Sequence, residues 1–128
     1  MADNGTQSVN TTSPKFSKTI QFLMLDSKQA LDNGNYQLAG RIIERAIRIE
    51  INNPWLWHNL AVVRVRQKEY QSAIQLGLKS NDLSNEELPK WKRKLQLNNW
   101  KLIHFCHLEL GETKNAKKAL KIVKNLSF

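Results

Sequence analysis

The stretch 53–80 has the pattern of two short helices joined by a polar turn, and the rest of the chain repeats it. Asn53 and Pro54 suit the start of a helix, because an asparagine side chain can cap free N–H groups and proline has none to leave unpaired. Small and apolar residues recur at a distance of 34 residues, in the pairs Leu23 and Trp57, Ser27 and Ala61, Tyr36 and Tyr70, Ala39 and Ala73, and Ala46 and Ser80. A fixed period of this length predicts helical hairpins that stack on one another.

A third copy of the pattern follows at a longer distance. Trp100 repeats Trp57 and Ala116 repeats Ala73, both 43 residues further on, so nine residues are inserted before Trp100. We expect the insertion to lengthen the first helix of the third hairpin at its N-terminal end, over about residues 85–99, since this run contains helix formers and no glycine.

Apolar periodicity and turn residues place six helices along the chain, with little or no strand. They are expected from Pro14 or Ser17 to about 33, at about 35–50, 54–68 and 70–82, from a start between 85 and 89 to about 110, and at 112–125. Ser84 and Glu87 have the spacing of a capping box ahead of the fifth helix. In the second helix, the side chains expected to point inward are Tyr36, Ala39, Ile42, Ile43, Ala46 and Ile49.

Two motifs connect this pattern with a known repeat. Trp57-x-x-Leu60-Ala61, followed by Tyr70-x-x-Ala73, resembles the tetratricopeptide repeat (TPR), and the resemblance covers nearly all of the chain after its first fifteen residues. It implies an all-α fold of three helix-turn-helix hairpins, with about six helices stacked as a short right-handed solenoid.

Five positions depart from the repeat, and two of them, Ile51 and Asn85, replace the proline that normally ends repeats one and two. Asp26 stands where the first copy usually has an apolar residue, Gly77 where the second has an aromatic residue, and Thr113 where the third has a tyrosine. The small residues at the expected helix contacts are kept, and they are Ser27, Ala39, Ala46, Ala61, Ala73, Ser80 and Ala116. We therefore expect the repeat fold in spite of the departures.

The resemblance also implies a concave groove built from the first helix of each hairpin. The residues expected to face it are Met24, Lys28, Leu31 and Asp32, then His58, Asn59, Val62 and Arg66, and finally Lys101, Leu102, Phe105 and Glu109. Asn59 matches the asparagine that TPR proteins often direct at the backbone of a ligand. The alternative for each of these residues is an ordinary solvated or packed side chain.

Positive charge is the second informative feature. The chain has 20 Lys and Arg against 11 Asp and Glu residues, a formal net charge of +9. Basic residues at helical spacing form a stripe of Arg41, Arg45 and Arg48, a stripe of Lys114, Lys117, Lys121 and Lys124, and a cluster of Lys90, Lys92, Arg93 and Lys94. Solvated helix faces explain such stripes, and an acidic partner, an anionic polymer or a membrane surface is the functional alternative. Nucleic acid is less favoured, because no nucleic-acid-binding motif accompanies the charge.

The first fifteen residues differ in composition from the rest. Residues 1–15 are mostly polar, as in a disordered tail ahead of one domain over 16–128, and they lack the apolar centre of a signal peptide. Residues 48–57, 78–81 and 98–103 resemble small TPR proteins of gammaproteobacteria, many of which are envelope lipoproteins. This resemblance implies a periplasmic or envelope location, with anchoring through a removed N-terminal lipoprotein signal. The cytoplasm is the alternative.

Catalytic chemistry has little support. His104 and His107 flank Cys106, but too few further ligands accompany them for a metal site, and we expect both histidines to be buried and hydrogen-bonded. The single cysteine excludes an internal disulfide. No phosphate-binding loop or nucleophile motif is present, so no cofactor is expected.

The sequence therefore predicts a non-enzymatic scaffold or adaptor that binds an extended peptide or a helix of another protein in its concave groove. The alternative is a protein that binds an anionic polymer or a membrane surface through its basic helix faces. The sequence leaves open which protein is the partner and what the oligomeric state is.

Overall fold

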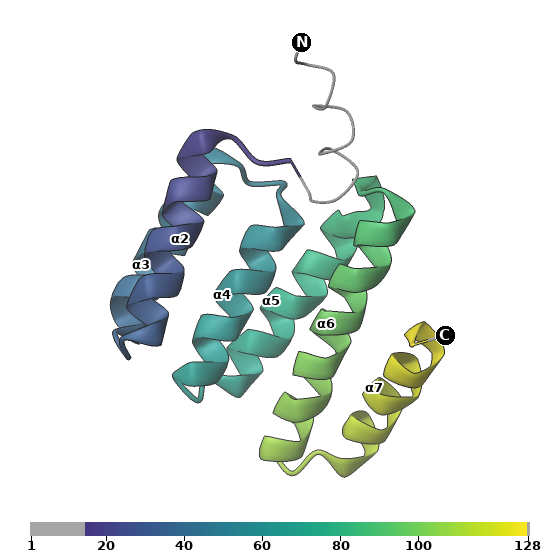
Figure 1. Ribbon diagram of the computed structural model, residues 1–128. Helices are drawn as coiled ribbons and strands as arrows, with labels where there is room; N and C mark the ends of the chain where they lie inside the picture. The colour runs from purple at the N-terminus through teal and green to yellow at the C-terminus, as the bar shows by residue number, and fades with distance from the viewer. Residues whose placement is uncertain (1–14, 128) are drawn as a thin grey trace.

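The computed structural model describes residues 15–127, which form six α-helices and one short 3-10 helix (Figure 1). Their bounds are α2 Lys18–Asp32, α3 Tyr36–Ile49, α4 Pro54–Arg66, α5 Tyr70–Leu83, η1 Ser84–Glu86, α6 Pro89–Glu109 and α7 Thr113–Leu126. No strand occurs in this range. The predicted all-α fold of six helices is confirmed, whereas the predicted tail falls almost entirely on residues outside the described range.

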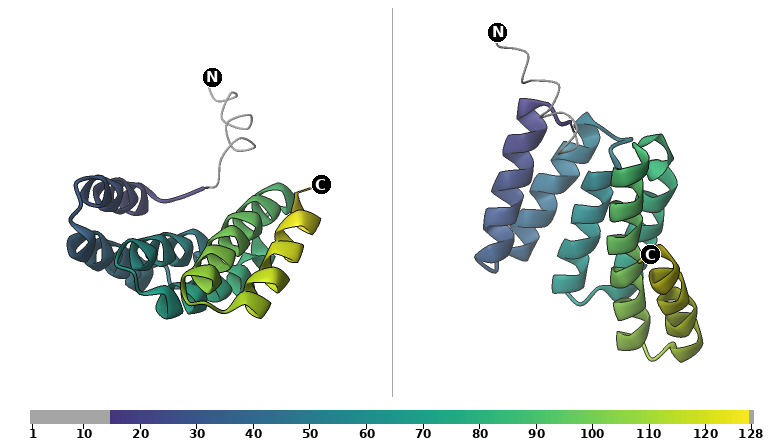
Figure 2. Two further views of the ribbon diagram at one scale, coloured as in Figure 1. Left: turned by 90° about the horizontal axis from the view of Figure 1, so that it is seen from below. Right: turned by 45° about the vertical axis from the view of Figure 1, so that its right-hand side comes forward.

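The helices pair as three antiparallel hairpins that stand side by side. The hairpins are α2–α3, α4–α5 and α6–α7, and α3 packs against both α2 and α4, as α5 packs against both α4 and α6. Seen along the helices, the hairpins follow an arc, with α2, α4 and α6 on its inner side and α3, α5 and α7 on its outer side (Figure 2). The arc therefore has the inner surface that the sequence predicts.

The turn inside each hairpin has the same conformation. Gly34, Lys68 and Gly111 have φ angles of 81°, 62° and 73°, and these positions are separated by the same 34 and 43 residues as the repeats. In each turn the N–H of this residue donates to the carbonyl three residues before it, and the next N–H donates to the carbonyl five residues before it. This pattern ends a helix in a left-handed residue, a conformation that favours glycine. Lys68 adopts it in the second hairpin without being glycine.

Side-chain caps fix three of the helix starts. Ser17 accepts a hydrogen bond from the Ile20 N–H at 3.3 Å, and Asn35 and Asn53 do the same for α3 and α4. The capping box expected from Ser84 and Glu87 is wrong. Ser84 lies in η1 and its hydroxyl donates to the Asn81 carbonyl, while α6 begins at Pro89 without a side-chain cap.

The insertion lengthens α6 at its N-terminal end, as predicted. This helix has 21 residues, against 13 in α4. Gly77 explains one departure from the repeat, because a Cβ atom at this position would lie 3.3 Å from Cγ1 of Ile103 on α6. The two helices α5 and α6 approach each other too closely at this point to leave room for an aromatic side chain.

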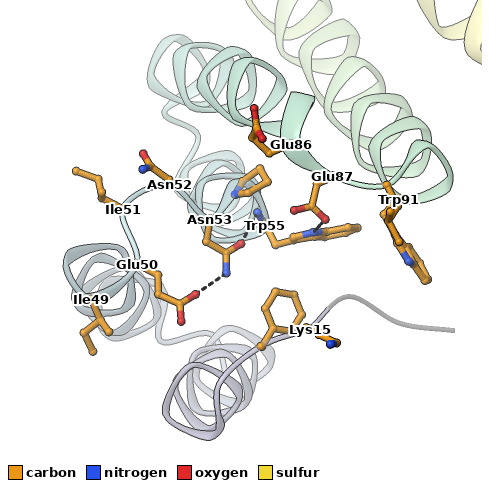
Figure 3. Close-up of a pocket in the computed structure, with 13 residues that line it drawn as sticks. Lys15, Ile49, Glu50, Ile51, Asn52, Asn53, Trp55, Glu86, Glu87 and Trp91 are labelled. Carbon is orange, nitrogen blue, oxygen red and sulfur yellow. Dashed lines mark hydrogen bonds between the residues drawn. The ribbon is translucent and has the colours of Figure 1, made fainter. Parts of the chain in front are cut away.

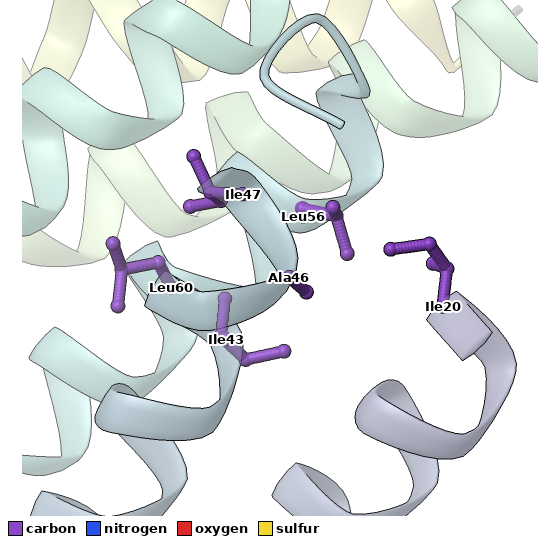
Figure 4. Close-up of a cluster of buried hydrophobic side chains, with 6 residues drawn as sticks. All are labelled: Ile20, Ile43, Ala46, Ile47, Leu56 and Leu60. Carbon is purple, nitrogen blue, oxygen red and sulfur yellow. The ribbon is translucent and has the colours of Figure 1, made fainter. Parts of the chain in front are cut away.

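The seven small residues predicted at helix contacts are all buried. Larger apolar side chains fill the space around them, in a first cluster of Ile20, Ile43, Ala46, Ile47, Leu56 and Leu60 (Figure 4) and a second of Ala73, Ile74, Ile103, Cys106 and Ala119. The inward position predicted for Ile49 is wrong, since this side chain is 53% exposed. Ile49 comes six residues after Ile43, so its side chain is rotated about 120° around the helix axis from that of Ile43. Ile47 lies on the packed face instead.

Candidate protein-binding surface

A hollow of about 350 Å³ lies between α2 and α4, the first two helices of the inner layer. We call it the inner hollow, and it is lined by Met24, Leu25, Ser27, Lys28, Leu31, Asn59, Val62 and Val63. Five of these residues were among those expected to face the groove, namely Met24, Lys28, Leu31, Asn59 and Val62. The repeat pattern therefore brought together residues of two different hairpins.

The inner hollow has apolar walls and a polar rim. The Lys28 ammonium lies 2.8 Å from the Asp32 carboxylate, and both side chains are largely exposed. The Ser27 hydroxyl is committed elsewhere, because it donates to the Ala39 carbonyl at 3.0 Å. Asn59 has no side-chain hydrogen bond to another residue of the range 15–127, so its amide can pair with a ligand backbone. Leu25, which is 62% exposed, was missed from the sequence although it follows Met24 directly.

Other residues expected in the groove lie elsewhere on the helices. Arg66 and Lys101 are exposed but do not line the inner hollow. Phe105 is 42% exposed and packs edge to face on the Tyr70 ring at a centroid distance of 6.0 Å. Leu102 is half-buried near Gly77. The inner hollow therefore involves the first two hairpins, and the third hairpin contributes none of its lining.

His58 lies at the junction of α4 with α6 rather than in the inner hollow. Its Nδ1 atom is 2.7 Å from Oδ1 of Asn99, a fully buried residue. Burial lowers the pKa of His58 below its usual value, and the hydrogen bond to Asn99 opposes this in part. The histidine is thus part of the packing between helices, so we leave it out of the candidate site.

A larger cleft, of about 680 Å³, lies at one edge of the stack, where the N-terminal end of α2, the α3–α4 turn and the insertion meet (Figure 3). Its lining includes Phe16, Glu50, Asn53, Trp55, Glu86, Glu87, Leu88 and Trp91. The Trp55 indole N–H donates to Glu87 at 3.2 Å, and the Trp55 and Trp91 rings pack edge to face. No sequence pattern indicated this cleft, because its walls come from loops and from residues without a repeat partner.

The two basic stripes do not form one surface. Arg41, Arg45 and Arg48 lie on α3, whereas Lys117, Lys121 and Lys124 lie on α7, and Figure 1 shows these helices at opposite ends of the stack. The cluster at the start of α6 partly covers an aromatic ring, since the ammonium groups of Lys90 and Lys94 lie 5.1 and 5.6 Å from the centre of the Trp91 ring.

The histidines and the cysteine considered as catalytic or metal-binding residues take part in the packing between helices. Both histidines are hydrogen-bonded, as expected: Nδ1 of His104 pairs with the Ala116 carbonyl, and Nδ1 of His107 pairs with the Glu112 carboxylate. Burial, with a smaller contribution from Glu109, raises the pKa of the Cys106 thiol to about 11, so the thiol stays protonated at neutral pH. Among residues 15–127, no group of three or more His, Cys, Asp or Glu side chains could hold a metal ion.

The fold, but not the sequence, matches a known protein. Neither a protein-family model nor a curated protein sequence matches the chain. Among solved structures, the globular C-terminal domain of LpoP from P. aeruginosa matches with a TM-score of 0.78 at 24% sequence identity, over 86% of this chain and 99% of that chain. This likeness shows a shared all-helical fold, which is compatible with a TPR-like arrangement.

Proposed function

We propose that this chain is a non-enzymatic protein-binding module that holds an extended peptide or a helix of a partner protein on its inner surface. The observation that supports the proposal is the inner hollow, where apolar side chains from two hairpins surround a space of about 350 Å³. Its setting, from the sequence resemblance, is the bacterial cell envelope.

The chemistry of the inner hollow suits the side chains of a peptide. A helix that lies in a groove inserts apolar residues spaced three or four positions apart, and an extended peptide inserts alternate residues. Met24, Leu31 and Val62 give such anchors an apolar wall. Asn59 can pair with the backbone of the ligand, and the exposed Lys28–Asp32 pair offers both charges at the rim.

Leu25 and Phe22 allow a matched test of the proposal. Both lie on α2 and are exposed, at 62% and 65%, but only Leu25 lines the inner hollow. The full chain is first used to isolate a partner from its native organism, and the purified partner is then titrated against the parent, a Leu25→Glu/Asn59→Ala variant and a Phe22→Glu variant.

We expect the Leu25→Glu/Asn59→Ala variant to bind at least about tenfold more weakly, the effect of losing one central contact. The Phe22→Glu variant should bind like the parent, and circular dichroism should show the same helix content in all three proteins. Equal affinity of the parent and the Leu25→Glu/Asn59→Ala variant would overturn the proposal, as would an equal loss in both variants.

A further inference from the structure

Positive charge is concentrated on the third hairpin. Residues 89–128 contain ten Lys and Arg and two Asp and Glu residues, whereas residues 1–88 contain ten and nine. Within the range 15–127, none of the ten basic side chains of the third hairpin forms an ion pair. Nearly all of the net charge therefore comes from one end of the stack, where no ion pair with a described residue neutralises it.

The lysines of α7 point away from the core. Ala116 and Ala119 are buried against the rest of the protein. The opposite side of the helix carries exposed lysines, and we call it the basic face: Lys114, Lys117, Lys118, Lys121 and Lys124. Because α7 is the last helix of the stack, no further helix covers this face within the described residues (Figure 1).

A hollow of about 360 Å³ adjoins the C-terminal end of α7, and the start of α6 forms its other wall. Lys92, Arg93, Gln96 and Asn125 supply its polar lining. The Arg93 Nε–H donates to the Leu126 carbonyl at 2.8 Å, which holds the guanidinium in place, and its terminal N–H groups make no hydrogen bond to a residue of the range 15–127. Two cations and two amides around one hollow suit a phosphate group, which arginine recognises with parallel hydrogen bonds.

We propose that the basic face docks on an anionic phospholipid surface, with a lipid phosphate in the hollow between α6 and α7. Lysines close to an anionic bilayer are attracted to it, and a row of five is typical of proteins that bind such a surface reversibly. Within residues 15–127 no helix is long and apolar enough to cross a bilayer.

Two observations favour a membrane over nucleic acid. Trp91, the aromatic residue among the basic residues of α6, is only 8% exposed and cannot stack on bases. By contrast, Leu108 and Leu110, next to the turn that joins α6 to α7, are 52% and 39% exposed. Proteins that rest in the interfacial layer of a bilayer combine exposed apolar side chains with lysines, and the third hairpin carries both.

The two basic stripes provide a matched test. The full chain is floated with vesicles of phosphatidylcholine alone and with vesicles that also contain phosphatidylglycerol. A Lys117→Gln/Lys121→Gln/Lys124→Gln variant and an Arg41→Gln/Arg45→Gln/Arg48→Gln variant each lose three positive charges, at opposite ends of the stack. A Lys92→Gln/Arg93→Gln variant tests the hollow, and inorganic phosphate and duplex DNA are tested as separate ligands.

We expect binding to the anionic vesicles only, with a loss of at least about tenfold in the α7 and hollow variants and a change of less than about twofold in the α3 variant. An equal loss in the α3 and α7 variants would overturn the proposal, because net charge alone would then explain binding. Tighter binding to duplex DNA than to anionic vesicles, or binding of inorganic phosphate without any vesicle binding, would also overturn it. Helix content measured by circular dichroism excludes unfolding as the cause of a loss.

Discussion

His58 on α4 and Asn99 on α6 are joined by a hydrogen bond of 2.7 Å between Nδ1 and Oδ1. The Asn99 amide nitrogen donates in turn to the Ser80 hydroxyl at 2.8 Å and to Asn81 at 2.9 Å, and Ser80 donates to the Pro54 carbonyl. Because Oδ1 of Asn99 can only accept, the proton of the neutral His58 ring lies on Nδ1. One buried polar network thus connects α4, α5 and α6, the helices at the junction of the second and third hairpins.

Asn99→Ala should destabilise the fold by roughly 1–3 kcal/mol, since it leaves buried donors and acceptors of the network unpaired. The measurement is urea unfolding followed by circular dichroism. Asn98→Ala is the control, because Asn98 is only half-buried and makes no side-chain hydrogen bond within the described residues. An Asn99→Ala variant as stable as the Asn98→Ala variant would show that the network does not hold the hairpins together.

Stability should fall as the pH is lowered below about 6.5, the ordinary pKa of histidine. Burial lowers the pKa of His58 in the folded protein, so the unfolded chain binds more protons between the lowered pKa and 6.5. The free energy of unfolding therefore decreases through this window and levels off below the folded pKa. Unfolding of the parent and of a His58→Gln variant across this range should show a weaker pH dependence in the variant, and identical slopes would contradict the assignment.

Lys68→Gly should stabilise the protein by roughly 0.5–1 kcal/mol, because it removes a side chain from a left-handed backbone position. Gly34→Ala and Gly111→Ala should destabilise it by about 1–2 kcal/mol for the same reason. Since no atom lies within 4 Å of a Cβ added at either glycine, backbone strain alone is tested. Thermal unfolding of the three variants checks the signs, and a less stable Lys68→Gly variant would contradict the shared turn geometry.

Amide exchange should be slow across residues 92–96, because the insertion forms the first turns of α6. Lys92 already donates its N–H to the Leu88 carbonyl at 2.8 Å. Hydrogen exchange resolved by NMR should show protection there close to that of residues 100–106. Exchange as fast as that of an unstructured peptide would mean that the insertion is a loop.

The repeat spacing was sufficient to predict the helical hairpins and how they stack. An alanine or serine recurs at each close helix contact, and these small residues limit how the hairpins can pack. The same spacing brought Lys28, Asn59 and Val62 to one hollow. It could not place His58, whose position follows from its hydrogen bond to Asn99, forty-one residues away. The repeat spacing assigns a residue to one face of a helix, and a residue at the edge of that face can point inward or outward. The spacing therefore cannot predict such a contact.

The cleft lined by Trp55 and Glu87 shows a second limit. Its residues come from the ends of α3 and α4, the turn between them, η1 and the insertion, and the last two have no counterpart in the other repeats. The hydrogen bond between these two side chains depends on how the insertion folds back over α4. Local patterns carry no information on such a contact, so this part of the surface had to come from the structure.

The inner surface is tested most directly by cross-linking from single positions on the intact protein. A photoreactive benzoyl-phenylalanine replaces Leu25 or Asn59 in the inner hollow, or Arg45 or Gln75 on the exposed surface of the outer helices. After illumination in cells, mass spectrometry identifies the proteins attached at each position. We predict that one partner protein is captured from positions 25 and 59 and not from 45 or 75. Capture of that partner from 45 or 75, with none from 25 or 59, would contradict binding on the inner surface.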